Sequence, residues 1–188
     1  TGQETERKEA EPYKAQNFRI TDDHLGEGGA KTKYAFNIAA IQTLKQIEAE
    51  GRQARPDEQE ILSRYVGWGG LPQAFDAENA SWQKEYQQLK SLLTDEEYAA
   101  ARGSTLNAHY TSPTVIKAMY DALGKMGFQS GNILEPSCGV GNFFGWQCLG
   151  YAAGKHEPKP AVRCGAGQHH GTHGAAALSR CENRDHGL

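Results

Sequence analysis

The feature that most limits what this chain can fold into is a short apolar stretch that runs directly into a glycine-rich turn, ILEPSCGVGNFF at residues 133–144. The apolar residues predict a β-strand ending at Glu135, and Gly139 and Gly141 let the backbone approach a ligand without a Cβ in the way. This favours a nucleoside site in a Rossmann-like sheet, where ligands bind at the carboxyl ends of strands. Phe144 replaces the third glycine of GxGxxG, which disfavours a dinucleotide. Taken alone, the pattern fits a ligand-free strand-to-helix turn equally well.

The sequence ahead of this turn is dominated by helical signals. Apolar residues recur at three- and four-residue steps, which predicts an amphipathic helix with Tyr34, Ile38, Ile41, Leu44 and Ile47 on one face. Gly51 fits a left-handed C-cap, and Pro56 fits the first turn of the next helix. Thr94 and Glu97 form a capping box, and Ser112 precedes Pro113 at another helix start. The apolar residues of this last helix are predicted to share one face: Val115, Met119, Ala122, Leu123 and Met126. The predicted helices are 31–50, 57–65, 80–93, 95–102 and 113–126, and the predicted strand is 132–136.

Two glycine-rich segments interrupt the helices. YVGWGGLPQAF at residues 65–75 predicts a compact loop, in which Trp68 either fills the core or stacks on a base. Core filling is the favoured interpretation, because an exposed Trp in an isolated loop is uncommon. GEGGAKTK at residues 26–33 resembles a phosphate-binding loop, but Ala30 stands where that pattern requires a glycine, and no apolar strand precedes it. It therefore predicts only a loop that leads into a helix.

The overall charge and hydropathy exclude some classes of protein. The net charge is −3 and the pI about 6.2, whereas a dedicated nucleic-acid module carries a basic excess. No apolar stretch is long enough to span a bilayer and no signal peptide opens the chain, so we expect a cytoplasmic protein without a membrane partner. The chain begins at Thr1 rather than Met, which is compatible with a cut start.

The glycine turn and the segment upstream of it resemble two motifs of the N6-adenine DNA methyltransferases. LEPSCGVGNF is similar to their S-adenosylmethionine (SAM)-binding loop, motif I, and NAHYTSPTVIKAMYDAL is similar to motif X, which precedes motif I in this circular order. The resemblance implies SAM as the cofactor and DNA as the partner. It also implies that Tyr110, Thr111 and Pro113 line the methionine end of SAM. The remaining implied cofactor contacts come from Glu135, Pro136, Ser137, Gly139, Gly141 and Phe143.

A narrower resemblance covers about residues 13–145. YKAQNFRITDDHLGEGGAKTKYAFNIAAIQTLK and YVGWGGLPQAFD are similar to segments of the large methyltransferase–helicase proteins of conjugative elements and plasmids. In that family a SNF2-like helicase region lies far downstream, so none of the motor is expected here. The fold implied is a disordered lead-in at 1–15, a mainly α-helical N-terminal part at 16–103, and at 104–145 the start of an incomplete α/β Rossmann-like SAM-dependent methyltransferase domain.

The tail, residues 146–188, has a different character. It shows no helical or strand period, and it holds five of the seven histidines and three of the four cysteines. Spacings such as C-x₂₋₄-C are absent, so we expect no metal site and no packed core. When the possible codons from Val162 onward are read from their second nucleotide, they permit YGVELDSITGR. The family shows a strand of this kind after motif I, ending in the acid that would bind the SAM ribose. A frameshift between about residues 145 and 150 therefore explains this aberrant tail.

The resemblance also indicates what the chain lacks. It contains no Asn/Asp-Pro-Pro-Tyr/Phe segment, whose polar groups would hold the adenine amine and whose aromatic ring would stack on the flipped base. The expectation is a fragment of a DNA adenine N6-methyltransferase that has no catalytic residues of its own. Two alternatives stay open: a non-catalytic DNA-binding or helicase-associated module of a conjugative-element protein, and an inert truncation product.

Overall fold

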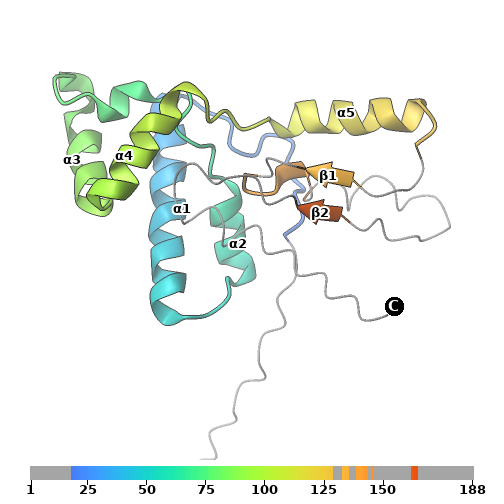
Figure 1. Ribbon diagram of the computed structural model, residues 1–188, viewed down its shortest axis with the longest axis horizontal. Helices are drawn as coiled ribbons and strands as arrows, with labels where there is room; N and C mark the ends of the chain where they lie inside the picture. The colour runs from blue at the N-terminus through green and yellow to red at the C-terminus, as the bar shows by residue number, and fades with distance from the viewer. Residues whose placement is uncertain (1–17, 129–132, 136–138, 144, 146–161, 165–188) are drawn as a thin grey trace, which may run out of the picture.

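The fold is taken from a computed structural model of the chain (Figure 1), which describes residues 18–128, 133–135, 139–143, 145 and 162–164. This part of the chain is mainly helical. The expected lead-in and nearly all of the tail lie outside it. None of the helices in these ranges is long and apolar enough to cross a membrane.

The first two helices pack against each other. Helix α1 (Ala30–Glu50) and helix α2 (Pro56–Ser63) lie side by side. Gly51 ends α1 with φ 61° and ψ 30°, the left-handed cap that its glycine predicts. Pro56 occupies the first turn of α2, where its missing N–H costs nothing. The predicted positions of both helices are confirmed, and so is the apolar face of α1, most of which is buried.

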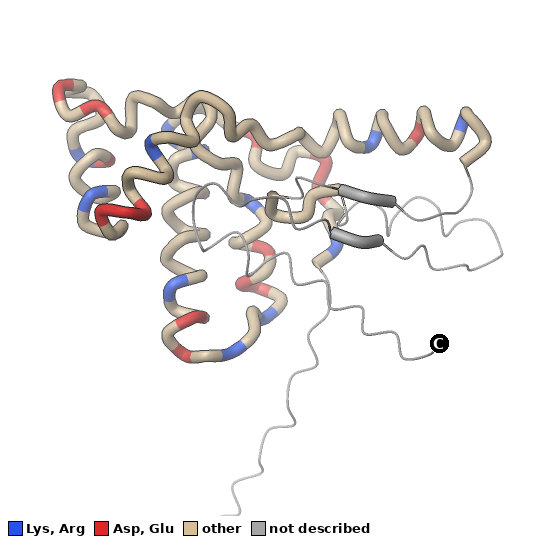
Figure 2. Tube along the Cα trace, viewed as in Figure 1, with Lys and Arg blue, Asp and Glu red and all other residues tan. Residues whose placement is uncertain are grey.

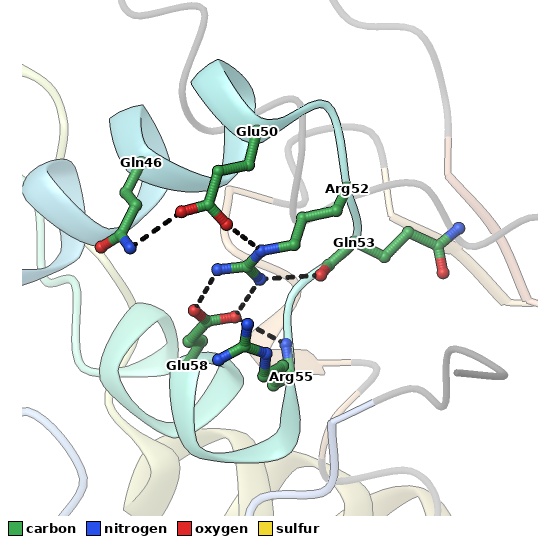
Figure 3. A network of polar contacts seen from close by, with 6 residues as sticks. All are labelled: Gln46, Glu50, Arg52, Gln53, Arg55 and Glu58. Atoms are coloured by element: carbon green, nitrogen blue, oxygen red, sulfur yellow. Dashed lines mark hydrogen bonds and ion pairs between the residues drawn. The ribbon is translucent and has the colours of Figure 1, made fainter. Parts of the chain in front are cut away.

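An ionic network joins the end of α1 to the start of α2 (Figure 3). The Arg52 guanidinium donates to both carboxylate oxygens of Glu58 at 2.6 Å each, and it also contacts Glu50. The bond from Arg52, together with the backbone N–H of Arg55, lowers the pKa of the Glu58 carboxyl to about 2. The same guanidinium lowers the pKa of Glu50, which Gln46 also contacts at 3.0 Å. The network therefore fixes the turn between the two helices.

The rest of the helical region consists of short elements, again largely as predicted. Thr94 and Glu97 form the expected capping box at the start of α4, with both reciprocal hydrogen bonds present. The predicted 80–93 helix is divided, because its first turn is a 3₁₀ helix that Asn79 caps. The elements are η1 (Pro72–Phe75), η2 (Ala80–Trp82), α3 (Gln83–Leu92), α4 (Asp95–Gly103) and η3 (Ser104–Leu106).

An aromatic cluster holds these elements against α1. Trp68 is only 1% exposed, and its ring meets the rings of Tyr34 and Phe75 edge to face, with centroids 6.1 and 5.2 Å apart. Such pairs add to the gain from burying apolar surface. The prediction that Trp68 fills the core is confirmed. The buried members of this cluster are Tyr34, Ile38, Trp68, Leu71, Ala74, Phe75, Trp82, Leu89, Leu93 and Ala101.

The remaining elements are one helix and two short strands. Helix α5 (Pro113–Lys125) begins after Ser112, as predicted, although the Ser112 side chain makes no capping bond. Strand β1 (Ile133–Glu135) lies where a strand is predicted and pairs in parallel with β2 (Val162–Cys164), so that Glu135 is opposite Cys164. Strand β2 lies in the tail, where the sequence shows no period. The sequence predicts a single strand, at 132–136, and so misses β2, because a three-residue strand depends on its partner rather than on a pattern of its own.

Helix α5 does not bury the apolar stripe that its sequence predicts. Ile116 is fully buried, against Ile20 and Leu25 of the segment that precedes α1. The opposite face of the helix is exposed. This exposed face carries Ala122 and the large apolar residues Val115, Met119, Leu123 and Met126. The helix is therefore held along one narrow line of contact.

Candidate functional site

The candidate site is centred on Tyr110, which lies between two glycines from distant parts of the sequence. A Cβ added to Gly67 would lie 2.4 Å from Cε2 of Tyr110, and a Cβ added to Gly139 would lie 2.7 Å from Cε1, on the opposite edge of the ring. Both glycines have positive φ, +71° and +53°. Any side chain at either position would be strained and would also displace the ring. The ring thus occupies a slot between two backbone segments, and Tyr65 packs edge-on against it, with centroids 5.6 Å apart.

Gly139 has a different role from the one that its sequence suggests. The pattern predicts a glycine so that a ligand can approach, whereas the Cβ position at Gly139 is taken by Tyr110 of the same chain. Gly141 also has a positive φ, +84°, and residues 139–143 are half-buried. The Cβ side of Gly139 is therefore closed by Tyr110.

Asn37 holds the other side of the slot. Its side chain is completely buried in α1; Nδ2 donates to the Gly67 carbonyl at 2.6 Å and Oδ1 accepts from the Val66 N–H at 2.9 Å. One amide thus satisfies two backbone groups of the loop that contains Trp68. Gly69 is fixed as well, because its N–H donates to the Ala108 carbonyl at 3.1 Å and a Cβ there would lie 2.3 Å from that oxygen.

The segment that precedes α1 closes the far end of the turn. The Ile20 N–H donates to the Gly145 carbonyl at 3.3 Å, and a Cβ on Gly145 would lie 2.8 Å from Cγ1 of Ile20. Tyr120 of α5 donates from its hydroxyl to the Phe143 carbonyl at 3.0 Å. The glycine turn is therefore held by α5, by the segment ahead of α1, and by Tyr110.

The nine predicted cofactor residues fall into four groups. Tyr110 and Gly139 are in contact, and Gly141 and Phe143 continue the same turn. Thr111 is half-buried beside Tyr110 in sequence, and Pro113 is buried as the first residue of α5. Glu135 is the last residue of β1. Pro136 and Ser137 lie outside the described residues.

Sequence reasoning missed Asn37 and Gly67. A signal for Asn37 was present, because it lies three residues after Tyr34 on the apolar face of the helix, where a polar residue needs a buried partner. Gly67 was seen only as part of a compact loop. Its partner, Tyr110, is far away in the sequence, so no local pattern could indicate the pair.

Among the described residues there is no group of three or more His, Cys, Asp or Glu side chains that could hold a metal ion. The tail histidines and the cysteines Cys148 and Cys181 lie outside those residues. Comparison of the chain with models of protein families, with curated proteins and with solved structures found no match.

Proposed function

We propose that this chain forms the SAM-binding front of a SAM-dependent DNA adenine N6-methyltransferase, and that it does not complete methyl transfer alone. The observation that carries the proposal is the contact between Tyr110 and Gly139. These residues belong to the two segments that resemble motifs X and I, and the whole of α5 separates them in the sequence. The resemblance implies that both segments contact the same cofactor, and their proximity supports this.

The residues present could accommodate the methionine end of SAM in a simple way. The turn comes a few residues after β1 in the sequence, Gly139 and Gly141 have positive φ, and residues 139–143 are half-buried. Backbone N–H and C=O groups of such a turn can bind an amino-acid moiety without a side chain in the way. When bound, SAM supplies an electrophilic methyl group on its sulfonium. Tyr110 would fix the turn, and Thr111 would offer a hydroxyl beside it.

A separate observation supports the proposal that this chain does not complete methyl transfer alone. An adenine that is flipped out of a duplex needs an aromatic ring to stack on and polar groups that grip its amine. The sequence has no two adjacent prolines and hence no Asn/Asp-Pro-Pro segment. Trp68, the candidate for base stacking, is buried in the helical core. Its burial also removes the main observation in favour of a separate DNA-binding module, and basic and acidic side chains are mixed along the helices (Figure 2).

The first test measures SAM binding by NMR titration of the whole chain. We expect weak binding, in the millimolar range, which Gly139→Val abolishes because the new side chain collides with Tyr110. Gly127→Val is the matched control: Gly127 also has a positive φ, +88°, but a Cβ there meets nothing within 4 Å. Absence of binding by the unaltered chain, or equal binding by the unaltered and Gly139→Val chains, would contradict the proposal.

A second test concerns the chemistry. Labelled methyl transfer from SAM to adenine in duplex DNA should stay at background for this chain, and transfer above background would refute the claim that it is incomplete. A frame-restored, extended version should bind SAM about tenfold or more tightly, because each charge-assisted hydrogen bond to the ribose adds about 1.5–3 kcal/mol. Equal affinity of the two versions would exclude the expected second-strand acid.

A further inference from the structure

We infer that Asn37 of α1 is a positioning residue for the glycine turn: it holds the Gly67 loop against Tyr110, and Tyr110 in turn fixes Gly139. The helical region would then be a working part of the ligand site rather than a separate leader. The identity of the ligand rests on the function proposed above. The support that α1 gives to the glycine turn does not depend on that function, and it can be measured without any ligand.

The first link is a pair of hydrogen bonds in a buried place. Asn37 is 0% exposed, and its amide bridges two successive backbone positions, the Val66 N–H and the Gly67 carbonyl. Buried backbone groups that lose their partners are costly, so the loop conformation depends on this side chain. Apolar residues such as Tyr34 and Ile38 surround it on α1, and neither could provide the two bonds. Asn37 therefore sets where Gly67 lies.

The second link is steric. Gly67 and Gly139 meet opposite edges of Tyr110, and there is no room for a Cβ at either. A shift of Gly67 towards the ring must be passed to Gly139, whereas a shift away leaves the ring loose. Because close-packed contacts transmit displacements, the position of α1 determines the position of the glycine turn through Gly67 and Tyr110. Closeness in the sequence does not explain why Tyr110 contacts Gly139, because α5 and β1 lie between the two residues.

The experiment is hydrogen–deuterium exchange on the full chain, followed in the peptides that cover residues 139–143 and 83–103. Gly67→Ala tests the steric link, and Gly70→Ala is its matched control. Gly70 has a similar positive φ, +80°, in the same loop, but a Cβ there meets nothing within 4 Å. Asn37→Leu removes both hydrogen bonds while keeping the same branched arrangement of heavy atoms. Asn37→Asp keeps the oxygen that accepts from Val66 and loses the donor to Gly67.

We expect Gly67→Ala and Asn37→Leu to speed exchange at residues 139–143 about tenfold relative to Gly70→Ala, with a smaller effect of Asn37→Asp. Exchange at residues 83–103 should stay unchanged, which separates positioning from a general loss of stability. SAM affinity in the NMR titration should fall about tenfold in the same two variants. Exchange at 139–143 equal to that of Gly70→Ala in both would overturn the inference.

Two outcomes keep the inference and the proposed function apart. If Asn37→Leu does not fold, Asn37→Asp tests the hydrogen bond to Gly67 and the comparison of Gly67→Ala with Gly70→Ala tests the steric link, and exchange at residues 139–143 equal to that of Gly70→Ala in either would overturn the inference. If the unaltered chain binds no SAM, the proposed function fails, while the exchange at residues 139–143 still supports or overturns the role of Asn37.

Discussion

The helical region and the region of α5, β1 and the glycine turn are stabilised in different ways. The first packs α1, α3, α4 and the Trp68 loop around one aromatic cluster, whose members are nearly inaccessible to solvent. Among the large apolar side chains of α5, a helix that the structure describes throughout, the fully buried one is Ile116, which packs against Ile20 and Leu25 from the segment ahead of α1. Large apolar side chains of α5 stay exposed. The first region therefore has a core of its own, whereas the second depends on contacts with the segment ahead of α1.

This difference predicts two levels of stability within one chain. Buried apolar area provides most of the favourable free energy of folding, at about 25 cal/mol per Å². Segments with few buried contacts open locally at a lower free-energy cost than the core. The contact between Gly67, Tyr110 and Gly139 is then the place where the stable region supports the less stable one.

The largest expected effect lies in the helical core. Trp68→Ala should lower the free energy of unfolding by about 3–5 kcal/mol, because it leaves a cavity between Tyr34 and Phe75. Met119→Ala, on the exposed face of α5, should change it by less than about 0.5 kcal/mol. Urea unfolding followed by circular dichroism measures both. Similar losses for the two variants would show that the regions do not differ as described.

A change in the second region should have a more local effect. Ile116→Ala removes the deepest contact of α5, and such truncations cost about 2–5 kcal/mol where the surroundings cannot relax. We expect faster hydrogen exchange in α5 and in residues 139–143, with α1 and α3 unchanged, because local opening does not require the helical core to unfold. Equal acceleration throughout the chain would instead mean that both regions unfold as one unit.

The smallest expected effect is a loss of folding stability at acidic pH. Because Arg52 lowers the pKa of Glu58 from its ordinary value of about 4.5 to about 2, the ionised carboxylate stabilises the helical region. This contribution is complete above pH 4.5 and is lost as the pH falls from 4.5 to 2. Glu58→Gln should therefore be less stable than the unaltered chain at neutral pH, and the difference should shrink through this window. Glu60→Gln, at the exposed pair with Arg64, is the control for the loss of one carboxylate from the same helix.

The parts of the fold that the sequence could predict are those with local causes. Gly51, Pro56 and the capping box at Thr94 mark element boundaries through their own backbone chemistry, and each is observed. The slot around Tyr110 could not be predicted, because it brings together three segments that are far apart in the chain. Strand β2 was missed for the same reason, since its pairing with β1 creates it.

For the candidate site, sequence similarity and structure contribute differently. Tyr110 and Gly139 were singled out by resemblance to two motifs, and the structure brings them together. The predicted apolar face of α5 shows the limit of periodicity. Spacing identifies a stripe such as Val115 and Met119, but it does not say whether that stripe has a partner to cover it, and here Ile116 beside it is the buried residue.

The burial of two tryptophans has a practical consequence for spectroscopy. The chain has three tryptophans, and Trp68 and Trp82 both lie in the helical core, 1% and 7% exposed. Within the described residues, Nε1 of Trp68 has no hydrogen-bond partner, and the Lys31 ammonium lies 4.0 Å from the Trp82 ring centroid. Replacing Trp146 with Phe would leave a fluorophore pair that reports on the helices alone. The ring resonances of Tyr110 would report on its contact with Gly139, so a single sample would show whether the glycine turn detaches before the helices melt.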